Sequence, residues 1–428
     1  MQVNRTQPKP TIAKLVITAE AAELEPIKQQ VLEHLAKHVK VQGFREGKAP
    51  ANLIEKQLDP SQLQSEFLEQ AVNQFYVDAI QQQNVRPAAQ PQITINKFVP
   101  FTTLEFTAEV DAVGEITLGD YKKVKLAQKP VEVTAKDVTE VIENLRGRSA
   151  EKKPVERAAK LDDEVIIDFK GVDAKTKESI QGADGKEYPL TLGSNSFIPG
   201  FEEEVVGLKP GEKKTFDITF PADYGVKDLQ KRQVSFTVTA LKINEQVKPK
   251  ADDAFAATVG PFKTIAELKA DIKKQLKAER EREAQQLYDN ELLEKVAEKS
   301  TVAVPDSLID SEIDRIEEDE KRNLVYRGQT WEEHLKAEGV TAAEHREQKR
   351  ESATLRVKIG LLLGEIAEAE KITVTPEELE IRLQLLKGQY TDPTMQAELA
   401  KPDNRRDIAS RLMTEKTIDK LRGYALLK

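Results

Sequence analysis

The chain of 428 residues contains no cysteine, few aromatic residues and no long apolar run. The absence of cysteine excludes disulfides, thiolate metal sites and cysteine nucleophiles. No apolar run reaches the roughly 18 residues that a membrane-spanning helix needs. The N-terminal segment MQVNRTQPKPTIAK lacks the apolar core of a signal peptide. We therefore expect a soluble, cytoplasmic protein that has no membrane contact.

The chain is highly charged and net acidic. It holds 74 acidic and 65 basic side chains, a net charge of −9, and 32% of its residues are charged. Net negative charge disfavours binding of nucleic acid over the whole surface, although a local basic patch is compatible with it. At roughly 100–200 residues per domain, the length predicts several domains, and the 39% apolar content is sufficient for their cores.

Residues 1–112 have the pattern of a small α+β domain. Ile27, Val31 and Leu35 recur every four positions, which is typical of one helix face. In the last predicted strand, apolar residues alternate with polar ones, as a half-buried strand requires. The expected elements are a strand at 11–18, a helix whose face carries Ile27, Val31, Leu35 and Val39, a helix at about 51–82, and strands at 93–98 and 103–110.

Residues 113–149 differ from both neighbouring segments because charged residues flank one amphipathic stretch. Thr134 is the predicted N-cap of a helix whose apolar face holds Val138, Val141, Ile142 and Leu145. We interpret this segment as an extended connector that carries one helix.

Residues 150–246 hold most of the strand signals and many of the glycines. Strand-like runs such as VIIDFKG and VSFTVTALKI are separated by turns, including the Lys-Pro-Gly of 209–211. The stretch 199–208 has the pattern of a single helix. One helix across a small antiparallel sheet is the predicted architecture.

Residues 247–428 are predicted to be all helical. Thr375 and Pro376 have the pattern of an N-cap and a first-turn proline, followed by acidic residues. The apolar stripes are narrow, so they could leave apolar strips exposed in grooves or pack as an ordinary bundle. The stripes contain Ile265, Leu268, Ile272 and Leu276; Leu308, Ile309, Ile313 and Ile316; Leu355, Ile359, Leu362 and Ile366; and Ile408 and Leu412.

The sharpest local motif is GFREGKAP at residues 43–50, between the two predicted helices of the first domain. Its glycines and proline favour a tight exposed loop that presents Arg45, Lys48 and the apolar ring of Phe44. A basic tip with an aromatic ring suits RNA or an apolar protein patch, and an ordinary solvated turn is the alternative. The spacing of a phosphate-binding P-loop is absent.

GFREGKAP resembles the G-F-R-x-G-K-x-P signature of the bacterial trigger factor family, which comprises ribosome-associated chaperones. The resemblance implies that Phe44, Arg45 and Lys48 dock near the polypeptide exit tunnel, against protein and rRNA. It also implies that Gly43, Gly47 and Pro50 shape the loop. The variable position holds Glu46.

A second set of aromatic and apolar residues lies within 150–246, in a segment that has no histidine, metal cluster or nucleophile. Any chemistry there requires an apolar pocket, and the alternative is that the residues are simply core. The set consists of Phe169, Tyr188, Ile198, Phe201, Tyr224 and Phe236.

The runs IPGFEE, LKPGE and FPADYG resemble the FKBP-type prolyl isomerases. The resemblance implies a proline pocket with Phe169 and Phe236 as walls and Phe201 as floor. Tyr188, Ile198 and Tyr224 would form the rim, and the backbone N–H of Ile198 would donate a hydrogen bond to substrate. Ile180 and Gln181 stand where many relatives have an aromatic and an acidic residue, so we expect weak to moderate activity.

The histidines and acidic runs suggest little additional chemistry. His34 and His38 have a metal-compatible spacing, but no carboxylate stands between them as in H-E-x-x-H, and a solvated helix face is favoured. His334 and His345 suggest no function, and the acidic run 317–320 is interpreted as a solvated face. We expect no cofactor and no metal.

The resemblance to trigger factor covers essentially the whole chain and implies a multidomain α+β fold. Its parts would be a ribosome-binding α+β domain at 1–112, the connector at 113–149, an FKBP-type antiparallel sheet plus helix at 150–246, and an all-α chaperone domain at 247–428. The implied function is ATP-independent holding of nascent and unfolded chains, with prolyl isomerisation and self-association off the ribosome. A prolyl isomerase whose helices position substrate, and a free cytosolic holdase, are the alternatives.

Overall fold

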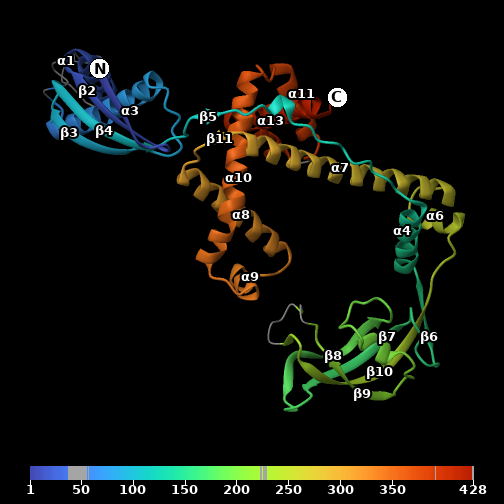
Figure 1. Ribbon diagram of the computed structural model, residues 1–428. Coiled ribbons are helices and arrows are strands. Elements are labelled where there is room, and N and C mark those ends of the chain that lie inside the picture. Colours follow the sequence, from blue (N-terminus) through green and yellow to red (C-terminus); the bar gives the residue numbers. More distant parts are fainter. Residues whose placement is uncertain (37–54, 56, 222–223, 225–228, 391, 427–428) are drawn as a thin grey trace. The chain divides into compact units, whose positions relative to one another are not determined.

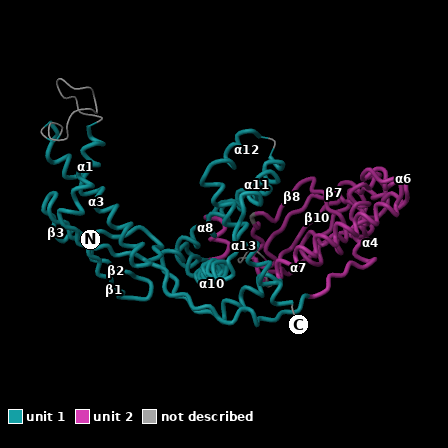
Figure 2. The backbone as a smooth tube through the Cα atoms, turned by 90° about the horizontal axis from the view of Figure 1, so that it is seen from above, with its two compact units in different colours: residues 1–128, 288–331, 340–428 teal, residues 129–287, 332–339 magenta. Residues whose placement is uncertain are grey.

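The computed structural model describes residues 1–36, 55, 57–221, 224, 229–390 and 392–426. The motif GFREGKAP therefore lies outside the described residues, as does His38. The described chain forms two compact units, which are coloured separately in Figure 2. Unit 1 comprises 1–128, 288–331 and 340–428, and unit 2 comprises 129–287 and 332–339.

Unit 1 begins with a four-stranded antiparallel sheet of order β1-β2-β4-β3 (Figure 1). Along β2 and β4, buried and half-buried residues alternate, so one face of the sheet is apolar. That face packs against two helices around the fully buried Phe67 and Phe106. The elements are β1 (Gln2–Lys9), β2 (Ile12–Glu20), α1 (Ala21–Ala36), α3 (Pro60–Gln82), β3 (Gln92–Val99) and β4 (Thr103–Asp111). The predicted strands are confirmed.

The remainder of unit 1 is mainly helical, and its core includes part of the predicted connector. Tyr121 and Val124 are buried among side chains of the helices, including Leu292 and Ile366. Thr375 caps its helix with a reciprocal capping box, as the sequence predicts. The elements are β5 (Ile116–Thr117), η1 (Tyr121–Lys123), β11 (Thr301–Val302), α8 (Asp306–Tyr326), α10 (Ala342–Ala369), α11 (Pro376–Lys387), α12 (Pro393–Leu399) and α13 (Pro402–Leu426).

The helices α8 and α10 pack through ion pairs and a small apolar core. The core holds Ile309, Ile313, Ile316 and Ala353. The acidic residues of α8 face basic residues of α10, and three of the paired groups are Arg346 with Asp314, Lys349 with Glu320, and Arg350 with Asp310.

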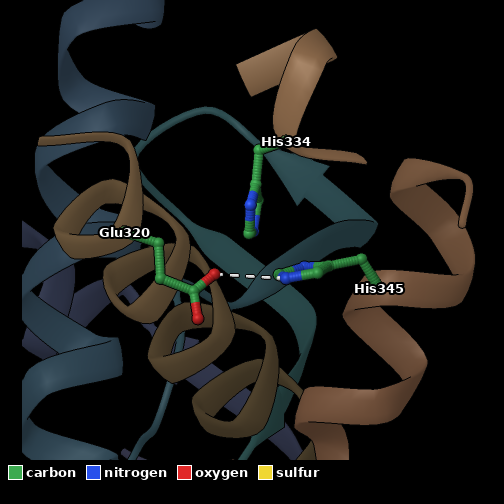
Figure 3. A group of neighbouring side chains, drawn as sticks. All are labelled: Glu320, His334 and His345. Carbon is green, nitrogen blue, oxygen red and sulfur yellow. Dashed lines mark ion pairs between the residues drawn. The ribbon is translucent and has the colours of Figure 1, made fainter. Parts of the chain in front are cut away.

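The interpretation of 317–320 as a solvated face is wrong for Glu317, which is buried and lies 3.0 Å from Nη1 of Arg346. His345, which suggested nothing in the sequence, is also buried, with 1% of its surface exposed. Figure 3 shows the carboxylate of Glu320 directed at the His345 ring, with Oε2 3.2 Å from Nε2. The ring of Trp331 meets the His345 ring edge to face.

Unit 2 contains a five-stranded antiparallel sheet of order β6-β10-β7-β8, with β9 paired to β10 (Figure 1). The single short helix α5 covers its apolar face, so the predicted helix-on-sheet arrangement is confirmed. The elements are β6 (Glu151–Val155), β7 (Glu164–Asp173), β8 (Ser179–Thr191), α5 (Phe201–Val205), β9 (Lys213–Thr219) and β10 (Gln233–Val247).

The predicted connector helix is α4 (Ala135–Arg148), and Thr134 caps it through a capping box with Asp137. Val138 and Ile142 pack against Phe255 and Leu268, which belong to the segments that follow the sheet. Those segments are α6 (Asp253–Val259) and α7 (Ile265–Lys299), while α9 (Trp331–Glu338) comes later in the chain. The residues of α7 are divided between the two units.

Most residues of the predicted apolar stripes are buried, as in an ordinary bundle; Leu268, Leu362 and Ile366 are among them. Of the two alternatives, ordinary bundle packing describes these stripes, since none of their residues is among the exposed large apolar side chains of the described chain. The exposed large apolar side chains stand at other positions, including Leu287, Val325, Tyr326, Ile381 and Leu385. No described helix has both the length and the apolar character needed to cross a membrane.

Candidate functional site: an aromatic cavity in unit 2

An open cavity of about 490 Å³ lies against the sheet of unit 2. The structure brings five of the six sequence-predicted residues to its wall: Phe169, Tyr188, Ile198, Tyr224 and Phe236. The sixth, Phe201, is fully buried at the start of α5 and supports the wall from below through ring contacts. Sequence positions that are up to 67 residues apart thus converge because β7, β8, α5 and β10 pack around one core.

The aromatic side chains of the cavity hold one another in edge-to-face contacts. The ring of Phe169 lies 5.9 Å from Tyr188 and 6.1 Å from Phe201, at interplanar angles of 90° and 78°. Phe201 meets Phe236 at 5.2 Å and 87°. Such contacts contribute about 0.5–1.5 kcal/mol each beyond burial, so they stabilise this arrangement of the wall.

Two glycines allow the aromatic walls to approach the backbone closely. A Cβ atom at Gly185 would lie 2.5 Å from Cε1 of Phe169, and one at Gly171 would lie 2.9 Å from Cε1 of Phe236. Both separations are far below carbon–carbon contact distance. A side chain at either position would therefore displace a wall ring.

Sequence reasoning missed Phe197, Phe220 and Leu229, all of which line the cavity. The ring of Phe197 lies 5.3 Å from Phe169 and packs against Phe201 at 4.2 Å. Its signal in the sequence is an apolar ring directly after the polar turn segment 193–196 and directly before Ile198. Ile180 stands where many FKBP-type relatives have an aromatic rim residue. It packs into the core and is not among the lining residues.

The loop that carries Phe197 and Ile198 is held by the carboxylate of Glu202, which is 5% exposed. Burial alone would raise the pKa of Glu202, but the backbone donors of Asn195, Gly193 and Phe197 outweigh it and lower the pKa. The donors are Gly193 N at 2.7 Å and Asn195 N at 3.2 Å from Oε2, and Ser194 Oγ at 3.2 Å, Ser196 N at 3.0 Å and Phe197 N at 3.3 Å from Oε1.

A larger cavity of about 710 Å³ in unit 1 has a different character. Its lining is polar and of mixed charge, with Arg5, Lys9 and Arg86 beside Glu115 and Glu365. Nη1 of Arg86 already lies 2.7 Å from Oε2 of Glu365. Ligand sites are usually apolar hollows with a few polar groups, so the aromatic cavity of unit 2 is the better candidate.

None of the remaining sequence candidates is among the described residues that line the aromatic cavity. Gly43, Phe44, Arg45, Gly47, Lys48 and Pro50 lie among the residues that the structure does not describe. Nδ1 of His34 lies 3.0 Å from Oε1 of Glu66 on the neighbouring helix, and its suggested metal partner His38 is not described.

Comparison with known proteins identifies the family. The family model described as bacterial trigger factor protein matches residues 1–145, and that of the trigger factor C-terminus matches 264–422. The trigger factor of Carboxydothermus hydrogenoformans is 33% identical over 419 residues, which cover 98% of each chain. The chain belongs to the bacterial trigger factor family. A trigger factor of Lysinibacillus sphaericus is 34% identical over 384 residues, or 89% of each chain.

The trigger factor chain also contains an FKBP-type peptidyl-prolyl cis-trans isomerase domain, since that family model matches residues 155–241. Every residue that lines the aromatic cavity lies within this range. A solved structure of the trigger factor chaperone aligns with 98% of this chain and 99% of its own, at 20% identity and a TM-score of 0.46. The predicted membership of the trigger factor family, with an FKBP-type isomerase domain, is confirmed.

Proposed function

We propose that the protein is an ATP-independent chaperone that docks at the ribosome exit tunnel, holds nascent polypeptides and isomerises X–Pro bonds. The full-length similarity to trigger factors, together with a preformed aromatic cavity in the isomerase domain, supports this proposal. The proposed division is docking domain 1–112, connector 113–149, isomerase 150–246 and chaperone domain 247–428. The proposed location is the cytoplasm, partly on ribosomes, with a homodimer off the ribosome.

In the proposed isomerase site, a prolyl ring enters between Phe169 and Phe236, above Phe201. Water stabilises the planar, charge-separated amide, so its removal by the aromatic walls lowers the barrier of about 18–20 kcal/mol toward the twisted state. Tyr188 and Tyr224 border the entrance, and the Ile198 N–H donates to a substrate carbonyl. Among the described residues, no backbone acceptor is paired with that N–H, which supports its availability.

The isomerase is tested by the rate of X–Pro rotation in a peptide and of proline-limited refolding. Phe236→Ala should lower kcat/KM at least about tenfold, because the wall is lost. Tyr326→Ala is the matched control, since Tyr326 is 91% exposed in unit 1. Equal rates for wild type, both variants and the uncatalysed reaction would refute the isomerase.

Holding of unfolded chains is proposed to use exposed apolar side chains surrounded by charge. Ile381 and Leu385 lie one turn apart on α11, with 62% and 64% of their surfaces exposed. Replacing both by serine should weaken suppression of client aggregation while isomerase activity persists. If Phe236→Ala instead abolished the whole benefit to folding, the alternative of an isomerase with positioning helices would be preferred.

Ribosome docking is proposed for the GFREGKAP motif and is tested by co-sedimentation across a salt series. The variant Phe44→Ala/Arg45→Ala/Lys48→Ala should lose binding that wild type shows at low salt. Lys269→Ala/Lys273→Ala removes two exposed positive charges from α7 and should bind normally. Equal binding of wild type and the motif variant, or no binding by either, would favour a soluble isomerase or a free holdase.

A further inference from the structure

We propose that Glu202 is a positioning residue of the isomerase: its carboxylate accepts the backbone N–H groups of Gly193 and of 195–197, and this sets the Phe197 ring and presents the Ile198 N–H to substrate. The inference rests on the proposed role of the Ile198 N–H. It goes further because it names the group that positions this donor. That group, Glu202, is not among the residues that line the cavity.

The loop has the geometry of an anion-binding nest, and the anion that it binds is the carboxylate of Glu202. Gly193 and Asn195 have φ angles of +89° and +53°, so the backbone turns in the left-handed region at both. The N–H groups of Gly193 and of 195–197 then point inward to one spot, which is the usual way in which backbone binds an anion. The two oxygens of Glu202 occupy that spot and accept four backbone N–H groups and one hydroxyl.

The chain turns sharply between the loop and Glu202, which brings the carboxylate back over the loop. Gly200 has a φ of +89° and directly precedes α5. Glu202 is the second residue of that helix. The N–H of Phe201 donates to the carbonyl of Ile198 at 2.9 Å. Ile198 is thus fixed on both sides. Before it, the N–H of Phe197 donates to Glu202, and after it, the N–H of Phe201 in α5 donates to the Ile198 carbonyl.

The pattern of donors explains why the Ile198 N–H is left for substrate. Glu202 takes the N–H groups of Asn195, Ser196 and Phe197, and the next N–H along the chain is that of Ile198. The Phe197 ring is oriented by the same peptide and packs on Phe169 and Phe201. Loss of the carboxylate would leave several donors without an acceptor, and the loop would rearrange to satisfy them. Both the ring and the substrate donor would then move.

The test compares Glu202→Gln and Glu202→Ala with Glu203→Gln and Glu203→Ala in the full chain. The glutamine of Glu202→Gln places an NH₂ group, which is itself a donor, where a carboxylate oxygen accepted backbone N–H groups. Glu203 is the control because it is the exposed neighbour on the same helix turn. The measurements are kcat and KM for an X–Pro peptide, and amide hydrogen exchange over 193–198. We expect kcat/KM to fall roughly ten- to a hundredfold at Glu202 and to be unchanged at Glu203, with faster exchange confined to the loop.

Chemical rescue separates positioning from general stability. Formate added to Glu202→Ala should enter the emptied nest and restore part of kcat/KM, whereas chloride at equal ionic strength should not. Unchanged kcat/KM in Glu202→Gln would overturn the inference, and so would faster exchange throughout β7 and β10 with no rescue by formate. An inactive wild type would refute the proposed isomerase instead, and loop exchange would still report whether Glu202 holds the loop.

Discussion

Oε1 of Glu370 accepts a hydrogen bond from the hydroxyl of Tyr121 at 2.7 Å, although 249 residues separate them along the chain. Oε2 of the same carboxylate accepts from the hydroxyl of Tyr424 at 2.8 Å, and Nζ of Lys122 lies 2.7 Å from Oε1. One acidic side chain at the end of α10 therefore joins η1 to the last helix of unit 1.

This cluster makes the stability of unit 1 sensitive to acid. The donors Lys122, Tyr121 and Tyr424 lower the pKa of Glu370 from 4.5 to about 2. A carboxyl group with a lowered pKa stabilises the fold fully above its unfolded value, so its contribution should disappear as the pH falls from 4.5 toward 2. Burial, and to a smaller extent the hydrogen bond to Glu370, raises the pKa of Tyr121 to about 12. The contribution of Tyr121 to stability should therefore be lost only as the pH rises above about 10.

Glu370→Gln should destabilise unit 1 by about 1–2 kcal/mol, because charge-assisted bonds are replaced by weaker neutral ones. Thermal unfolding at pH 7 and at pH 3 measures the effect, and the difference from wild type should shrink at the lower pH. Glu368→Gln, two residues earlier and largely exposed, is the control. A pH-independent difference would contradict the assignment of the effect to the charge.

Gly185→Ala should impair the isomerase without unfolding its domain. The added methyl group would meet the Phe169 ring, which must rotate or shift and thereby narrow the cavity. We expect kcat/KM for an X–Pro peptide to fall several-fold while circular dichroism is unchanged. Gly147→Ala on α4 has no neighbouring atoms within 4 Å and should leave the rate intact. A wild-type rate in Gly185→Ala would show that the ring accommodates the methyl group freely.

Phe197→Leu should raise KM for peptides more than it lowers stability. Leucine keeps the apolar contact with the core but removes the ring that faces Phe169 and Tyr188 at the cavity. Phe262→Leu, at the α6–α7 junction of the same unit, is the matched substitution away from the cavity. Parallel peptide kinetics and denaturant titration distinguish the two effects, and equal KM values for Phe197→Leu and wild type would contradict the role of the ring.

The α8–α10 pair should loosen with salt while the sheet of unit 2 does not. Its apolar core is small, and partly exposed ion pairs such as Arg346 with Asp314 hold the helices together. Salt screens such pairs over about 10 Å at 0.1 M and over shorter distances at higher ionic strength. Hydrogen exchange in α8 and α10 should therefore accelerate between about 0.05 and 0.5 M sodium chloride. In Arg346→Gln, hydrogen exchange in α8 and α10 should already be faster at low salt, and added salt should accelerate it less.

The helix caps and the strands with alternating apolar residues could be predicted because their signals are local, whereas the mostly exposed strands β1 and β6 were not predicted. Alternation along 103–110 and the capping residues Thr134 and Thr375 depend only on neighbours in sequence. The aromatic cavity was predictable only through a resemblance, since alternation cannot distinguish a pocket wall such as Phe169 from core.

The features that the sequence did not reveal depend on partners far along the chain or on unusual backbone. The burial of His345 and Glu317 depends on the pairing of α8 with α10, and an acidic run has the same pattern whether it faces water or arginine. Glu202 has the pattern of an acidic residue at the start of a helix, and only the folded structure, with left-handed turns at Gly193 and Asn195 and hydrogen bonds to Glu202, shows that it binds a loop.

The position of Tyr121 and Val124 in a core that also contains Leu421 and Ala425 has a consequence for biosynthesis. The cores of the first sheet and of the isomerase domain draw their buried residues from 13–112 and 159–243, so each can close soon after its own segment is translated. The helical core cannot, because it joins Tyr121 and Val124 to residues as late in the chain as Ala425. During synthesis, the apolar surface around Tyr121 therefore stays uncovered until α13 has been translated.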